Sequence, residues 1–254
     1  MKQISLSSIF QCAVKKQVGE IRLGEYLGHV NKNGIFIALA WPETSVIREG
    51  KWYDPLMKLI GVIKADHYKV GHAAMLLINQ STGDIRYFDF GRYHTPYQYG
   101  RVRDQETDPE LTISAKAKFQ DATITNLEAI LIDLQHNKAC HGDGPMICSM
   151  YDGIDYDVAF RFAKRMQLKG AIKYGPLEPL GTNCSRFVAA AARHSISHPL
   201  VKFLIKFPYT FSATPKFNLR IINNQQRVWV IDRGQVHTHD SSLRNLIGST
   251  YETR

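Results

Sequence analysis

One cysteine of this 254-residue chain lies where its thiol would be acidic. The segment "GTNCSRFVAAAARHS" (181–195) places Cys184 directly after Thr182 and Asn183, two residue types that cap helices. The first turn of a helix has unpaired backbone N–H groups and the positive end of the helix dipole, and both favour an anion. We therefore expect Cys184 to ionise readily and to attack a carbonyl group, with the same N–H groups stabilising the oxyanion. The alternative for this position alone is a buried core cysteine.

A nucleophilic cysteine needs a base, most often a histidine that a further polar group orients. His72 follows Gly71 and begins the apolar run "AAMLLI", which places its imidazole at the end of a buried strand. A polar turn at 80–84 would fold the next run back alongside this strand and bring Asp89 near His72. Aspartate is disfavoured inside a strand, so we expect this carboxylate to accept a hydrogen bond from the imidazole. The alternative is that His72 and Asp89 are ordinary strand-end residues.

Side chains close to these three in the sequence could contact a substrate. Arg92, Arg101 and Arg103 could bind a carboxylate or a phosphate, with a solvated loop face as the alternative. Four tyrosines could line a cleft or serve in ordinary packing: Tyr87, Tyr93, Tyr97 and Tyr99. We take Arg92 and Tyr93, together with Asn183 beside the cysteine, as the candidate substrate-binding residues.

The remaining cysteines and histidines form no convincing metal site. Cys140, His141 and Cys148 fit no common zinc spacing and would need a fourth ligand from elsewhere. His237 and His239, in "HTHD", read as part of an exposed turn. The sequence also has no phosphate-binding loop and no dinucleotide fingerprint. We therefore expect neither a metal ion nor a cofactor.

Buried β structure must hold the imidazole. The apolar segment 33–41 predicts a buried strand, and the segment 71–93 predicts a hairpin. Residues 111–119 alternate between apolar and polar, which is typical of a half-exposed strand. A second hairpin is predicted at 217–232, with its turn at 223–226.

Helices must hold the thiol and cover the sheet. One helix is predicted to begin near Thr125, which has capping-box spacing to Glu128, and another to begin after Asp155. The segment that begins at Cys184 is the third, and its alanines favour a closely packed neighbour. These elements predict an α+β fold, with an antiparallel sheet packed against helices.

Length and composition indicate one large globular protein. Hydrophobic residues make up 44% and charged residues 22% of the chain. We expect a catalytic domain over 1–204 and a β-rich C-terminal extension of the same domain over 205–254. No apolar stretch approaches the roughly 18 residues that a membrane span needs. The N-terminal segment lacks a convincing signal-peptide cleavage site, and the four cysteines are far apart. We therefore expect a cytoplasmic protein, or one exported without a classical signal peptide.

The net charge of +9 favours an acidic partner, such as a nucleic acid, anionic lipid headgroups or a negatively charged cell-wall polymer. The basic residues are scattered and no nucleic-acid-binding motif is present, so we expect no specific nucleic-acid partner. A basic binding domain, with Cys184 buried away from His72, remains the alternative from another functional class.

"GHAAMLLINQSTGDIRYFDF" followed much later by "TNCSRFVAAAARH" resembles the circularly permuted branch of the papain-like NlpC/P60 superfamily, which includes the lecithin:retinol acyltransferase-like proteins and bacterial cysteine peptidases. In that branch the histidine strand precedes the cysteine helix. The resemblance covers roughly residues 65–195 and implies a papain-like fold. It implies that Cys184 is the nucleophile, that His72 is the base, and that Asp89 occupies the third, polar position.

The residues and the resemblance together predict a cysteine hydrolase that attacks an amide bond of a peptide or cell-wall type through an acyl-thioester. One alternative is a lipid acylhydrolase or acyltransferase on the same fold. Another is a catalytically inactive papain-like module that binds a ligand in the cleft that forms the active site of catalytic members. In the inactive module, Cys184 would react no faster than Cys12, Cys140 or Cys148.

Overall fold

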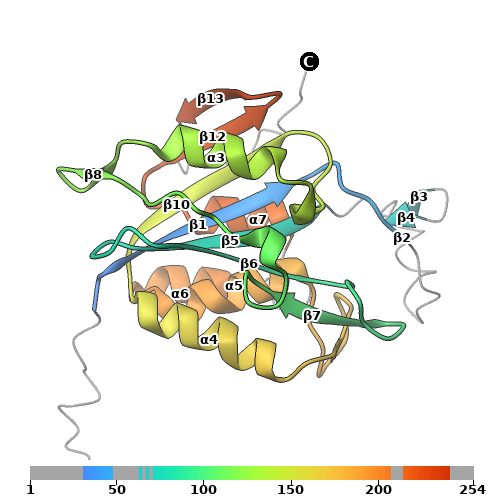
Figure 1. The fold of residues 1–254 in the computed structure, drawn as a ribbon. Coiled ribbons are helices and arrows are strands. Elements are labelled where there is room, and N and C mark those ends of the chain that lie inside the picture. Colours follow the sequence, from blue (N-terminus) through green and yellow to red (C-terminus); the bar gives the residue numbers. More distant parts are fainter. Residues whose placement is uncertain (1–30, 48–62, 65–66, 69–70, 207–213, 241–254) are drawn as a thin grey trace, which may run out of the picture. The chain divides into compact units, whose positions relative to one another are not determined.

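Eight strands form the central sheet of the protein in this computed structural model, and every hydrogen-bonded pair of them is antiparallel (Figure 1). The structure describes residues 31–47, 63–64, 67–68, 71–206 and 214–240. In order across the sheet, the strands are β11 (Ile172–Lys173), β7 (Tyr99–Arg103), β6 (Ile85–Gly91), β5 (His72–Asn79), β1 (Gly34–Trp41), β10 (Met146–Ile154), β12 (Arg227–Asp232) and β13 (Gln235–Asp240). Two smaller ladders comprise β2 (Val46–Ile47), β4 (His67–Tyr68) and β3 (Ile63–Lys64), and β8 (Phe119–Gln120) with β9 (Thr123–Ile124).

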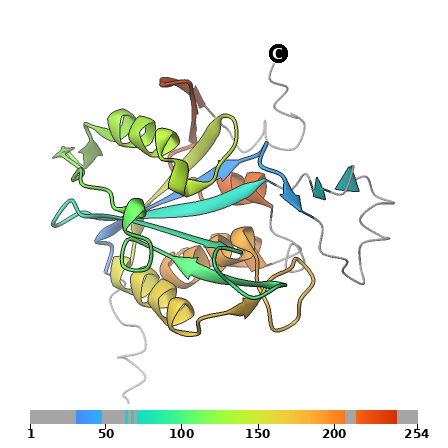
Figure 2. The same cartoon turned by 45° about the vertical axis from the view of Figure 1, so that its right-hand side comes forward.

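Helices cover both faces of this sheet, which gives three layers (Figures 1 and 2). Four helices pack on one face: α4 (Tyr156–Leu168), α5 (Cys184–Ser195), α6 (Pro199–Lys206) and α7 (Pro215–Ile221). The other face carries α3 (Leu127–His136) and two 3-10 turns, η1 (Pro109–Leu111) and η2 (Lys138–Cys140). The expected α+β fold with an antiparallel sheet packed against helices is therefore confirmed.

Strand alternation sorts the core into two halves. Phe36, Ala38 and Ala40 of β1 face the α5 layer, whereas the intervening Ile35 and Ile37 face the α3 layer. Because β1 is buried on both faces, its sequence reads as a continuous apolar run rather than an alternating one. The same alternation in β5 places Ala73 toward α5 and His72 toward α3.

Helix α5 begins where the sequence predicts it. The side chain of Asn183 accepts a hydrogen bond from the Arg186 N–H at 2.8 Å, which makes Asn183 the N-cap. The buried face of the helix includes Ala191 and Ala192, and these small side chains allow it to pack closely on the sheet. The cap and the packing together fix Cys184 as the first helical residue.

The strand 33–41, the hairpin 71–93 and the helix after Asp155 are confirmed by β1, by β5 with β6, and by α4. The hairpin turns at 80–84, where Gly83 has a φ of +73°. Asp155 caps α4 through a hydrogen bond from the Val158 N–H. The helix near Thr125 is also present as α3, but Asn126 is its N-cap residue, with no side-chain capping bond, so the proposed capping box is wrong.

Two predicted β elements are wrong. Residues 112–118 form no strand, although Leu111 and Ala117 are buried and the Ala117 N–H donates to the Gly83 carbonyl. Their alternation therefore reflects an extended loop against the hairpin turn.

The second wrong element is the hairpin predicted at 217–232. Its first arm is the helix α7, capped by Thr214. The true hairpin is β12 with β13, and β12 pairs with β10 of the central sheet. The domain boundary at 204/205 stays a prediction.

Candidate active site

Cys184 lies at the end of the sheet, with its side chain nearly enclosed. The residue is 5% exposed and begins α5. The Tyr174 hydroxyl, 3.9 Å from Sγ, donates a hydrogen bond to its sulfur. The backbone N–H of Ala73, the second residue of β5, lowers the pKa of the thiol. The thiol therefore lies among donors suited to hold a negative charge.

The imidazole of His72 reaches the same point from the first residue of β5. Trp41, its partner across the β1–β5 pair, stacks on the ring with centroids 5.7 Å apart. His72 Nε2 lies 3.3 Å from Asp89 Oδ2, so the ring's other nitrogen is the one available to the Cys184 sulfur. The ring is only 6% exposed, and both Asp89 and Cys184 raise its pKa. Cys184, His72 and Asp89 are thus brought together, as the hairpin and the helix start predicted.

The two reactive groups shift each other's protonation in opposite directions. Burial alone would lower the pKa of His72, but its hydrogen bonds to Asp89 and Cys184 outweigh burial and raise the pKa to about 9. Burial would likewise raise the pKa of the Cys184 thiol, yet the hydrogen bond and the charge of His72 lower it below its ordinary value. Both shifts favour the proton on the imidazole rather than on the thiol.

Asp89 is fully buried and held from several sides. Arg103 donates to both of its carboxylate oxygens, from Nε at 2.9 Å and from a terminal nitrogen at 2.5 Å. The Tyr87 hydroxyl donates to Oδ2 at 3.0 Å. Burial by itself would raise the pKa of Asp89, but His72 and Arg103 hold it below its usual value. The carboxylate therefore stays ionised beside the imidazole.

The three residues predicted to bind substrate lie around this centre, and each has a contact within the protein. Asn183 is the cap of α5. The guanidinium of Arg92 lies over the Tyr174 ring, 5.3 Å from its centroid. The Tyr93 ring contacts the guanidinium of Arg103 and stacks on the ring of His141, with the two ring centroids 4.5 Å apart. Binding of a substrate by these residues stays a prediction.

The other two arginines of this region pair with carboxylates. Arg101 makes a two-pronged ion pair with Asp108, at 2.7 and 2.8 Å. Arg103 points inward from β7 and is only 2% exposed, so it does not lie on a solvated loop face. Sequence reasoning missed Tyr174, which lies in the segment "KYGPLEPLGTN". Its closeness in sequence to Cys184 is the one signal that could have indicated it.

The residues considered for a metal do not meet. Within the described ranges, no group of three His, Cys, Asp or Glu side chains could hold a metal ion. Burial raises the pKa of the Cys140 thiol to about 12 and also raises that of Cys148 in β10. These two thiols are therefore chemically unlike Cys184, whose pKa is lowered.

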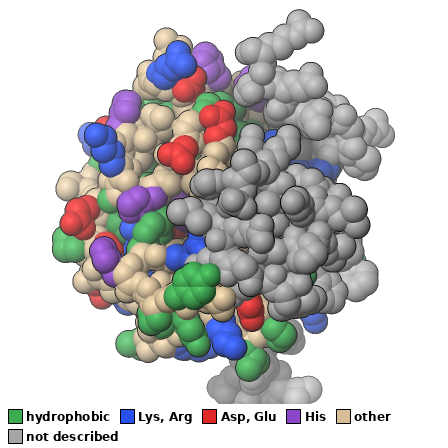
Figure 3. Space-filling model, turned by 90° about the vertical axis from the view of Figure 1, so that its right-hand side faces the viewer, with side chains coloured by type: hydrophobic (Ala, Val, Ile, Leu, Met, Phe, Trp, Pro, Cys, Tyr) green, Lys and Arg blue, Asp and Glu red, His purple; other side chains and the backbone are tan. Residues whose placement is uncertain are grey.

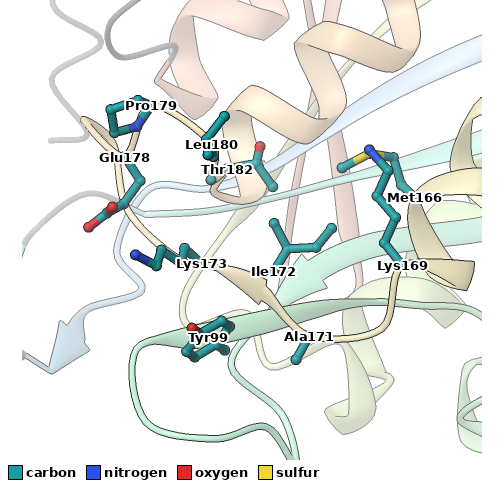
Figure 4. A pocket seen from close by; sticks show the side chains of 11 residues that line it. Tyr99, Met166, Lys169, Ala171, Ile172, Lys173, Glu178, Pro179, Leu180 and Thr182 are labelled. Atoms are coloured by element: carbon teal, nitrogen blue, oxygen red, sulfur yellow. The ribbon is translucent and has the colours of Figure 1, made fainter.

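A cavity of about 730 Å³ lies beside the loop that leads to Cys184 (Figure 4). The end of α4, strand β11 and residues 178–182 form its walls. Its apolar lining comes mainly from Met166, Ile172, Pro179 and Leu180, and it also has two lysines, Lys169 and Lys173. Thr182 in its wall is two residues before Cys184, so the cavity adjoins the chain segment that carries the thiol.

Residues 36–200 match the family model described as Type VI secretion system effector TseH-like. The chain belongs to this family. The matched region includes His72, Asp89 and Cys184 and ends before β12. The crystal structure of the type VI secretion system effector TseH is similar in fold, with a TM-score of 0.52 and 17% sequence identity. That likeness covers 82% of this chain and 98% of the TseH chain.

A search of curated proteins gave no match for this TseH-like chain. Among the helices that the structure describes, none is long and apolar enough to cross a bilayer. On the face shown in Figure 3, the described lysines and arginines are scattered among acidic and neutral side chains and form no continuous basic patch.

Proposed function

We propose that this TseH-like effector is a cysteine hydrolase with a circularly permuted papain-like fold, exported by the type VI route that its family name describes. The observation that carries the proposal is the buried pair of Cys184 and His72, with the thiol pKa lowered and the imidazole pKa raised to about 9. The order of the elements, with the histidine strand before the cysteine helix, agrees with the permuted branch.

In the proposed reaction, the Cys184 thiolate adds to the carbonyl carbon of an amide. The backbone N–H of Cys184, at the start of α5, donates to the oxyanion that forms. The His72 imidazolium then gives its proton to the nitrogen of the leaving amine, and the C–N bond breaks to leave an acyl-thioester. Neutral His72 next takes a proton from water. The resulting hydroxide attacks the thioester, and the thiolate leaves with the acid product released.

The substrate class that we favour is an amide of a peptide or cell-wall type. An anionic cell-wall polymer would be attracted by the net charge of +9. One observation favours the second candidate, a lipid acylhydrolase or acyltransferase. The largely apolar cavity beside residues 178–182 could receive an acyl chain, with Lys169 and Lys173 near an anionic headgroup. Matched amide and ester substrates with the same acyl group distinguish the two candidates.

The first test is the pH dependence of iodoacetamide labelling at each cysteine, read by mass spectrometry. Cys184 should label quickly near pH 6 to 7, roughly the range of an activated thiolate, and slowly in His72→Ala. Cys140 and Cys148 are matched internal controls, because burial raises their pKa values. Equal labelling of all three thiols in the folded protein would instead support an inactive binding module.

A further inference from the structure

Arg103 is a buried arginine that the reaction above does not use. It lies on β7 directly opposite Asp89 of β6 in the antiparallel register. Both residues face the α3 layer, on the same side of the sheet as His72. A charged side chain so deeply buried is rare unless it is paired, and Arg103 is paired with the carboxylate that hydrogen bonds to His72.

The guanidinium is fixed on three sides. Two of its nitrogens donate to the two oxygens of Asp89, and the terminal one also donates to the Ala139 carbonyl at 3.1 Å. Its face lies against the Tyr93 ring, with the carbon only 3.6 Å from the ring centroid. A lysine could supply the charge but not this planar, two-pronged geometry.

This arrangement means that the position of Asp89 does not depend on His72. Oδ2 accepts from Arg103 at 2.5 Å and from Tyr87 at 3.0 Å, whereas the contact with His72 is the longest, at 3.3 Å. The carboxylate can therefore stay in place while the imidazole gains and loses its proton. An aspartate held only by His72 would follow the ring or rotate away.

Arg103 also balances the charge of the enclosed site. The thiolate and Asp89 carry two negative charges, and the imidazolium and Arg103 carry two positive ones. Replacing Arg103 by a neutral residue leaves one unbalanced negative charge in a poorly solvated place. This imbalance favours uptake of a proton by the Cys184 thiolate.

We propose that Arg103 is a positioning residue: it holds Asp89 ionised and aimed at His72, and its charge helps to keep the thiolate of Cys184 at neutral pH. This inference rests on the proposed function, because it assigns Arg103 a role in the same site.

Other ionisable groups around this centre act on the same equilibrium. From every neighbouring element, they are Tyr87 on β6, Cys140 on η2, His141 after η2, Tyr174 after β11, and Arg92 and Tyr93 after β6. Of these described groups, Arg92 alone is always cationic. Its guanidinium lies over the Tyr174 ring.

The test uses three variants of the full chain and the pH midpoint of iodoacetamide labelling at Cys184. R103Q should raise this midpoint by about one pH unit, which corresponds to about tenfold less thiolate below the midpoint. R103K keeps the charge, so its midpoint should stay near the wild-type value. R101Q removes the same charge from the same strand, at a residue paired with Asp108, and is the matched control.

A second readout follows the orientation of Asp89. The His72 Nε2 proton, hydrogen bonded to a carboxylate, should give a downfield proton NMR signal in the wild type. In R103K this signal should weaken or move, because a lysine cannot donate to both Asp89 oxygens in the two-pronged geometry of arginine. The R103K spectrum tests the positioning role even if R103Q does not fold, which its thermal melt will show.

The outcomes separate two failures. If Cys184 labels slowly in the wild type, or H72A has no effect, the proposed function fails. If labelling is fast and depends on His72, the inference about Arg103 fails in either of two cases. The first is an R103Q midpoint within error of R101Q, and the second is a wild-type NMR signal in R103K.

Discussion

Asp89→Asn tests how strongly the buried ion pair holds the site together. The substitution keeps the shape of the side chain but removes its charge, and Arg103, which is 2% exposed, then has no anion to pair with. Breaking a buried pair from one side typically costs about 3–5 kcal/mol. The asparagine carbonyl can still accept one hydrogen bond, so we expect a loss of about 3–4 kcal/mol in the free energy of unfolding, toward the lower end of that range.

Urea unfolding followed by circular dichroism at pH 7 measures this loss, which for a chain of this size corresponds to a melting temperature lower by about 10 °C. The matched control is Asp108→Asn, which breaks the two-pronged pair with Arg101, where both side chains are partly exposed. There we expect about 1 kcal/mol or less. A loss in Asp89→Asn no larger than the loss in Asp108→Asn would refute the reasoning about burial.

Three further substitutions or conditions address other parts of the site. Asn183→Ala removes the cap of α5 and should lower the free energy of unfolding by about 1 kcal/mol, whereas Asn183→Ser should lower it much less, both measured by urea unfolding. Gly142→Ala would place a Cβ 2.3 Å from the Trp41 indole, so we expect altered tryptophan fluorescence and lower stability; an unchanged spectrum would contradict the close packing. Turnover of an accepted amide should fall as the pH rises through about 9, where His72 loses its proton, and a rate that stays level to pH 11 would exclude His72 as the acid.

The pairing of His72 with Asp89 could be predicted because it depends on local rules. A Gly-containing turn at 80–84 fixes the hairpin register, and that register pairs Asp89 with Ala74, two residues from His72. The N-cap before Cys184 is equally local. These signals lie in short stretches of chain, so the sequence was sufficient for them.

The role of Arg103 depends on a partner that the local sequence does not reveal. In "YGRVR" the arginines alternate with Gly100 and Val102, a pattern that normally indicates a solvent-facing side of a strand. Arg103 is buried because β7 pairs with β6 and sets it opposite Asp89. The helix α7 was missed for a different reason, since Thr214 and Pro215 gave a cap-and-proline start that the β-rich residues after them obscured.

The site joins two layers that meet only in the folded molecule. Cys184 belongs to the helical layer on one face of the sheet, whereas His72, Asp89 and Arg103 point toward the other face. Cys184 and His72 meet at the end of the sheet. A chain in which only one layer has docked would carry an ordinary thiol with an ordinary pKa. The labelling rate of Cys184 during refolding therefore reports when the two layers have come together. By the same argument, a chain in which they have not met carries no activated thiol.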